Sequence, residues 1–118
     1  MSAALPPGEL MAQEAQSGNP IVYQGKMGSD NVFFYFNLEN NLFLCLATMG
    51  GCEAKMTGNM TQNEEGVYKC APVWGINPDT YEAGWVDTSF EEYKTFDLKG
   101  NPEKIIFEGL ELTKIWTK

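Results

Sequence analysis

The stretch of residues 32–48, VFFYFNLENNLFLCLAT, constrains the fold of this chain more than any other segment. Two apolar runs rich in Phe and Leu flank Asn40 and Asn41. Asn is one of the few residues that accept the positive φ of a tight turn. The segment therefore predicts a β-hairpin that turns at Asn40-Asn41.

A two-residue turn would also set the register of this hairpin, because each residue before the turn pairs with one after it. Alternate side chains lie on one face of a strand, and the paired runs would give one wholly apolar face and one mixed face. Such a hairpin is expected at the centre of a sheet, with its second face at least partly covered. The expected pairs are Leu38 with Phe43, Phe36 with Cys45, and Phe34 with Ala47.

Further short strands recur about every ten residues along the chain, with turns between them. The predicted strands include residues 21–27, 52–61 and 67–74. Gly58 indicates a bulge within residues 52–61. At 118 residues, the chain has the length of one domain. The sequence predicts an all-β fold, a small antiparallel barrel or sandwich of about seven or eight strands.

Residues 1–20 differ in composition from the rest, since they hold Pro and Gly but no aromatic residue. Residues 9–16 favour one short helix with a weak apolar stripe. Residues 88–96 favour one or two helical turns, because Thr88 and Glu91 match a capping box; the alternative is a strand extended by Phe96 and Leu98. We expect residues 1–20 to form a flexible or loosely docked arm and residues 21–118 to form a single β domain.

Two residue types are missing from the sequence, His and Arg, and all eight basic residues are Lys. Without an imidazole there is no His-dependent triad and no His metal site. We therefore expect no enzymatic activity, no metal and no cofactor. A formal net charge of −8 disfavours nucleic acid and favours a partner with a basic surface, with plain solubility as the alternative.

The three cysteines leave at least one thiol unpaired in a monomer. Cys45 falls on the apolar face of the hairpin and is expected in the core. Cys52 and Cys70 flank the hairpin around residues 58–66 and are the candidate disulfide. Counting residues back from that turn places Cys70 opposite Gly58, so a bridge to Cys52 would need a bulge or a neighbouring strand.

A long, turn-rich connection covers residues 74–92 and carries aromatic and acidic side chains together. Loops bear binding residues more often than strands do, and Trp and Tyr are favoured in interfaces. The alternative is that the tryptophans pack at strand ends and the carboxylates are simply solvated. The candidate binding residues are Trp74, Asp79, Tyr81, Glu82, Trp85 and Asp87.

These features favour a small acidic protein-binding module. The run CEAKMTG, with a later GVY and a closing FEGL, is similar in its order of strands and turns to β-rich bacterial inhibitors and immunity proteins of exported enzymes. That similarity implies an inhibitor or immunity-type protein. The alternative function is a barrel that carries or senses a small apolar ligand.

The cellular location of the protein is predicted from weaker features of the sequence. No run approaches the roughly 20 apolar residues that a membrane span needs, and the N-terminus as written lacks a signal peptide. We expect a periplasmic or secreted protein whose signal has been removed, in preference to a cytoplasmic one. The sequence leaves the oligomeric state open.

Overall fold

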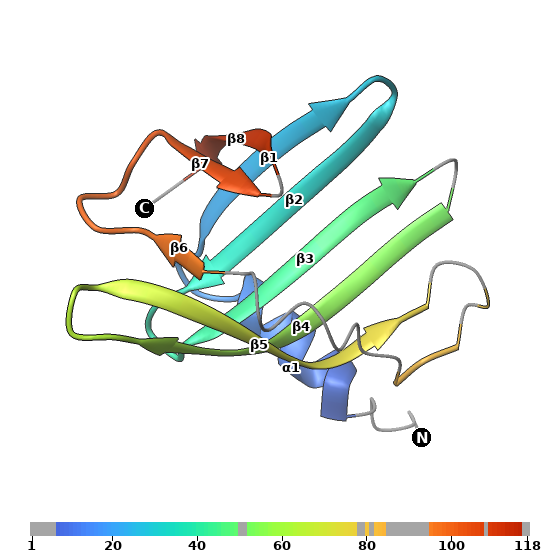
Figure 1. Ribbon diagram of the computed structural model, residues 1–118. Coiled ribbons are helices and arrows are strands. Elements are labelled where there is room, and N and C mark those ends of the chain that lie inside the picture. Colours follow the sequence, from blue (N-terminus) through green and yellow to red (C-terminus); the bar gives the residue numbers. More distant parts are fainter. Residues whose placement is uncertain are drawn as a thin grey trace.

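The chain folds into a nearly closed antiparallel β barrel with a helix on its outside, in agreement with the all-β prediction (Figure 1). The computed structural model describes residues 7–49, 52–77, 80, 82–84, 95–107 and 109–116. The elements are helix α1 (Pro7–Gln16) and strands β1 (Ile21–Met27), β2 (Asp30–Asn37), β3 (Leu42–Met49), β4 (Cys52–Gln62), β5 (Val67–Ile76), β6 (Thr95–Asp97), β7 (Lys104–Phe107) and β8 (Leu110–Trp116).

The strands lie in the order β6-β5-β4-β3-β2-β1-β8-β7, so β1 to β5 form a meander. The β7–β8 hairpin then returns to the start of the sheet, where β8 pairs antiparallel with β1. This pairing brings the two ends of the order, β6 and β7, towards each other (Figure 1). The meander therefore curls into a barrel with a seam between two short strands.

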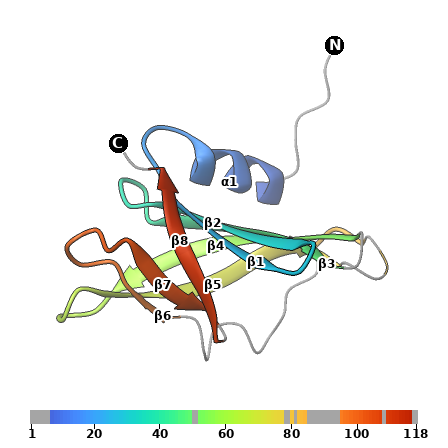
Figure 2. The same cartoon turned by 90° about the horizontal axis from the view of Figure 1, so that it is seen from above.

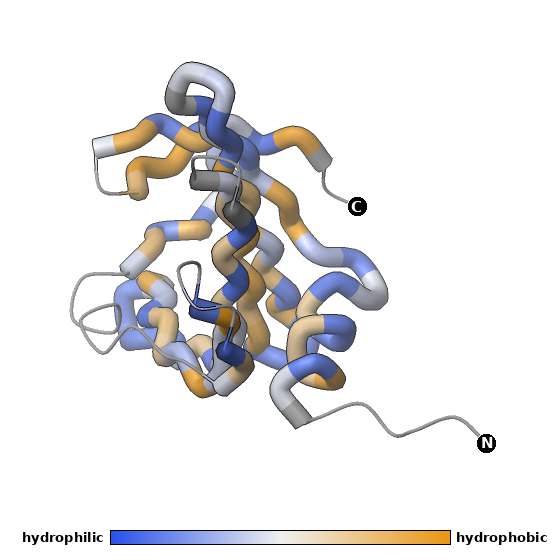
Figure 3. The backbone as a smooth tube through the Cα atoms, turned by 90° about the vertical axis from the view of Figure 1, so that its right-hand side faces the viewer, coloured by the Kyte–Doolittle hydropathy of each residue, from blue (hydrophilic) through white to orange (hydrophobic). Residues whose placement is uncertain are grey.

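Aromatic side chains close that seam from the inside. The Phe34 ring, on β2, lies 5.2 Å from the ring of Phe96 on β6 and 4.9 Å from that of Phe107 on β7. The Phe36 ring stacks on Phe34 at 5.5 Å. Figure 3 shows the alternation of hydrophobic and hydrophilic residues along the strands that directs such side chains inward. The barrel interior is a packed aromatic core.

The predicted register of the β2–β3 hairpin is wrong by two residues. Phe34 pairs with Cys45 and Phe36 with Phe43, so the connection is a four-residue turn over residues 38–41. The Asn37 side-chain oxygen accepts hydrogen bonds from the backbone N–H groups of residues 39 and 40, at 3.1 and 3.4 Å. A shift of two residues keeps every side chain on its predicted face, but it moves Leu38 out of the sheet and into the turn.

Helix α1 packs on the outer face of the sheet instead of trailing as a tether (Figure 2). Two helix residues that face the sheet, Ala12 and Ala15, are 1% and 0% exposed. They cover Leu42 and Leu44 of β3. The Asn37 amide donates hydrogen bonds to two carbonyl oxygens at the end of the helix, those of residues 14 and 17, each at 2.9 Å. Because the contacts use alanines, the apolar stripe that marks this docking is weak in the sequence.

Between Thr57 and Gly58 the pairing of β4 with β5 shifts and leaves Val73 of β5 as an extra residue, which confirms the bulge predicted at Gly58. A Cβ atom at this position would collide with the carbonyl oxygen of Ala71, so only glycine fits. At the tip of this hairpin the turn is tight, and Gly66 adopts a φ of 85°. The resulting register places Cys70 opposite Met60, not opposite Gly58.

The candidate Cys52–Cys70 disulfide is not formed. Cys70 is a reduced, buried thiol, and so is Cys45. Cys52 begins β4 and pairs with residue 49, whereas Cys70 lies opposite Met60, about 26 Å further along that strand at ~3.3 Å per residue. Disulfides join Cα atoms less than about 7 Å apart, so this register excludes the bridge.

We expect Cys45 and Cys70 to resist alkylation in the native protein and to react after unfolding. Burial, with a contribution from Cys45, raises the pKa of the Cys70 thiol, which keeps it in its unreactive protonated form. Peptide mapping after brief treatment with N-ethylmaleimide, with and without denaturant, measures the protection. Rapid native modification of Cys70 would show that the core opens readily.

The barrel is also closed by a hydrogen bond from Tyr23, on β1, to the turn between β6 and β7. Its hydroxyl donates to the carbonyl oxygen of Pro102 at 2.6 Å. Lys114 holds the same turn from β8 by donating to the carbonyl oxygen of Asn101 at 3.0 Å and pairing with Glu103 at 3.1 Å. Burial, and to a lesser extent Glu103, raises the pKa of Tyr23 to about 12.

Replacing Tyr23 with Phe is expected to cost about 1 kcal/mol near pH 8 and to make stability less sensitive to alkali. The tyrosine ionises near pH 10 when unfolded but near 12 when folded, so its stabilisation is complete below pH 10 and is lost between these values. The wild type should therefore lose about 1.4 kcal/mol more than Tyr23→Phe between pH 8 and pH 11, and about 2.7 kcal/mol more once the folded-state tyrosine is fully ionised. Urea unfolding at pH 8, 10 and 11 measures the gap, and a constant gap would contradict the prediction.

Candidate functional site

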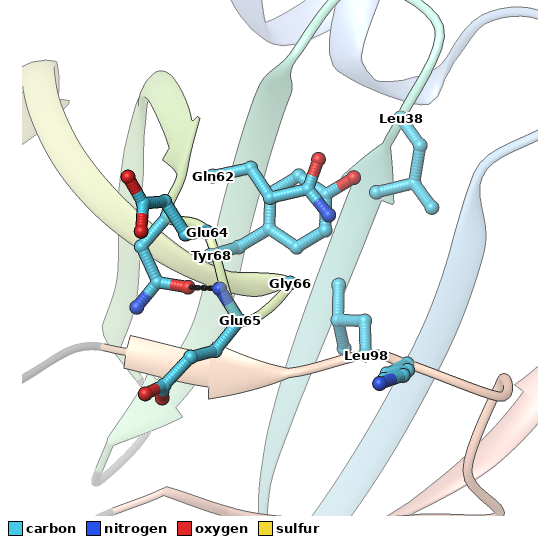
Figure 4. Close-up of a pocket in the computed structure, with 9 residues that line it drawn as sticks. Leu38, Gln62, Glu64, Glu65, Gly66, Tyr68 and Leu98 are labelled. Atoms are coloured by element: carbon cyan, nitrogen blue, oxygen red, sulfur yellow. Dashed lines mark hydrogen bonds between the residues drawn. The ribbon is translucent and has the colours of Figure 1, made fainter.

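A cavity of about 430 Å³ opens at the end of the barrel where the β4–β5 hairpin tip, the β2–β3 turn and the segment after β6 meet. We call it the end cavity (Figure 4). Cavities of this size are within the range that binds ligands in proteins. Its lining residues are Leu38, Gln62, Asn63, Glu64, Glu65, Gly66, Tyr68, Leu98 and Lys99.

Both turns around the end cavity are held by an asparagine side chain. Asn37 fixes the β2–β3 turn as described above, and Asn63 does the same for the β4–β5 tip. The Asn63 side-chain oxygen accepts hydrogen bonds from the N–H groups of Glu65 at 2.8 Å and Val67 at 3.0 Å. These local bonds give the turns a defined shape without help from a ligand.

The end cavity has an apolar wall and a polar surround. Leu38, Tyr68 and Leu98 point towards one another across the hollow in Figure 4. The carboxylates of Glu64 and Glu65 point to the other side of the hairpin tip, into solvent. Lining of this kind favours binding through apolar contact, and the carboxylates outside it would attract positive charge.

Of the six candidate residues from the sequence, only Trp74 and Glu82 lie in the described part of the chain. Trp74 is half-buried, and its ring lies against Gly8 at the start of α1, which supports the alternative that it packs at a strand end. Glu82 is exposed, and its carbonyl oxygen accepts a hydrogen bond from the N–H of Asn77 at 3.0 Å. The other four candidates, Asp79, Tyr81, Trp85 and Asp87, lie outside the described residues.

The end cavity lies by the start of β5, whereas the two described candidates, Trp74 and Glu82, lie near and beyond the other end of that strand (Figure 1). A binding site in the loop at residues 74–92 remains a prediction. Leu38 was missed as a site residue because a two-residue turn would have kept it in the strand. The signal that could have found it is Asn37, which has the side chain to cap a longer turn.

A second cavity of about 160 Å³ lies on the outer face of β2, β3 and β4. Phe33, Tyr35 and Leu46 line it, and the last two also pack beside α1. Within the described ranges, no three His, Cys, Asp or Glu side chains are grouped to hold a metal ion. The end cavity is therefore the larger of the two described hollows, and neither has a metal-binding cluster.

These features define the protein as a small, acidic, helix-covered β barrel with a preformed cavity at one end. Comparison with known protein families, with curated proteins and with solved structures found no match. In the part of the chain that the structure describes, no helix is long and apolar enough to cross a membrane.

Proposed function

We propose that this protein is a protein-binding module that recognises a partner with a basic surface through the end cavity and its acidic surround. The observation that carries the proposal is the end cavity, where Leu38, which is 37% exposed, and the partly exposed ring of Tyr68 remain accessible beside polar residues. Protein interfaces concentrate their binding energy in such central pockets, which the polar rim shields from water. The net charge of −8 supports the choice of a basic partner.

The biological role that we propose for this module is inhibition or immunity against an exported enzyme. The lack of His and Arg supports a role in binding, because the usual imidazole base of catalysis is missing. A cationic hydrolase would suit the acidic surface. Stoichiometric loss of that enzyme's activity is the expected consequence of binding.

The alternative, carriage of a small apolar ligand inside the barrel, receives less support. Phe34, Phe36, Phe96 and Phe107 contact one another across the interior, where such a ligand would have to sit. The two described cavities open instead at the barrel end and on the outer face. We therefore propose the protein-binding function alone.

Binding to a purified partner tests the proposal. Affinity capture from the host's own extract at low salt identifies the partner, and calorimetry with the purified pair gives the affinity. The double variant Glu64→Gln, Glu65→Gln is expected to slow association about tenfold at low salt, and less as salt rises. The matched control, Glu14→Gln with Glu53→Gln, changes the charge equally at exposed positions outside the end cavity and should behave as the wild type.

The loop predicted from the sequence provides the competing surface. If the partner binds at the end cavity, Leu38→Asp abolishes binding, while Trp85→Ala with Asp87→Ala has little effect. The reverse result would place the contact in the loop and overturn the assignment of the end cavity. Unfolding curves for each variant separate lost binding from lost folding.

A further inference from the structure

We infer that the end cavity takes a tyrosine or tryptophan side chain of the partner, presented on a loop that also carries basic residues. The inference rests on the proposed function and specifies which part of the partner is recognised.

The apolar wall fits a flat, bulky side chain. Leu38 is 37% exposed although it neighbours buried residues, and it faces Leu98 and the ring of Tyr68 across the cavity (Figure 4). A ring placed there covers the exposed part of Leu38 and meets Tyr68 in the offset or edge-to-face contact that aromatic pairs prefer, above the buried Leu98. Burial of this exposed apolar surface supplies the driving force for insertion.

The polar groups of the cavity favour an aromatic side chain with a polar tip. The side-chain amide of Gln62 and the side chain of Lys99 both belong to the lining. The Gln62 amide can accept a hydrogen bond from an indole N–H or a phenol hydroxyl. A leucine or phenylalanine would cover that amide without bonding to it, at a cost in affinity.

The charges beside the cavity favour basic neighbours of the anchor, not a basic anchor. Lys99 lines the hollow, so a cationic side chain placed there would meet a like charge. The carboxylates of Glu64 and Glu65 point away from the apolar wall (Figure 4). Lysine or arginine residues that flank the aromatic anchor in the partner would reach these carboxylates at the rim.

The shape of the cavity also exists before binding. Asn37 and Asn63 hold its two turns through short-range hydrogen bonds, so little ordering is required when an aromatic ring enters. Preorganised pockets lose less free energy to ordering than flexible ones. A single aromatic amino-acid derivative should therefore bind measurably without the rest of the partner.

Amide NMR of the full chain, titrated with blocked amino acids, tests the inference. N-acetyl-tryptophan amide and N-acetyl-tyrosine amide are expected to shift the amide signals of Gly66, Tyr68 and Lys99. N-acetyl-leucine amide and N-acetyl-lysine amide should bind at least about tenfold more weakly. Leu38→Asp should abolish the shifts. The matched control Ile106→Asp, at a 60% exposed residue on β7, should keep them.

The possible outcomes separate this inference from the proposed function. Equal binding of all four probes, or shifts confined to other residues, overturns the aromatic anchor. If the purified partner still binds and still depends on Leu38, the proposed function survives that result. Aromatic probes that bind at Leu38, together with a partner that loses affinity when its interfacial Tyr or Trp is changed to Ala, support both.

Discussion

A chain that lacks residues 1–18 is expected to melt about 15 °C or more below the full-length protein, or to lose cooperative unfolding. Helix α1 covers Leu42 and Leu44, which are 6% and 0% exposed. Burial of one such side chain is worth about 1.5–3 kcal/mol, so exposing both removes several kcal/mol. For a domain of 118 residues, each kcal/mol corresponds to about 3–6 °C in melting temperature.

A pair of point variants tests the same contact without shortening the chain. Ala12→Asp places a charge against the sheet and should undock the helix, whereas Gln13→Asp makes the same change at an exposed neighbouring position. Thermal unfolding followed by circular dichroism compares the two. A melting temperature within a few degrees of the wild type for both the deletion and Ala12→Asp would mean that the helix contributes little to stability.

The second large effect is expected for Phe34→Ala, at about 3–5 kcal/mol of unfolding free energy. The Phe34 ring is fully buried and contacts rings from three other positions, Phe36, Phe96 and Phe107. Its removal leaves a cavity at the point where the barrel seam between β6 and β7 is joined. We expect the β6–β7 region to lose amide protection before the rest of the barrel.

The neighbouring residue provides the control for this prediction. Phe33 points to the outer face of β2, where it is partly exposed and lines the 160 Å³ cavity. Phe33→Ala should therefore cost about 1 kcal/mol, far less than Phe34→Ala. Urea unfolding of both variants measures the difference. Similar losses at the two positions would contradict the assignment of inward and outward faces.

Much of the barrel could be predicted from the alternation of side chains along the strands. The sequence of residues 32–48 indicates which side chains face inward, and that assignment holds although the register is shifted by two. The bulge at Gly58 could also be predicted, because an isolated glycine inside a strand pattern marks a close backbone approach. In both cases the signal is local. The strand faces follow from an alternation with a period of two residues, and the bulge follows from a single glycine.

The candidate site could not be predicted in the same way. Leu38 and Leu98 are 60 positions apart in the chain and meet only because the meander curls and brings β6 to this end. The docking of α1 also could not be predicted from the sequence. The helix packs on the sheet through Ala12 and Ala15, and alanines give only a weak apolar signal. The candidate Cys52–Cys70 disulfide is not formed because Cys70 lies opposite Met60, eight residues along β4 from Cys52.

The sequence by itself determined the all-β class, the inward face of each central strand and the acidic, His-free and Arg-free chemistry of the chain. These properties follow from residue types and from spacings of a few residues. Only the tertiary structure decided the closure of the barrel, the docking of α1 and the end cavity. Each of these depends on contacts between distant residues, such as Tyr23 with Pro102, whose partners are selected by packing and strand register.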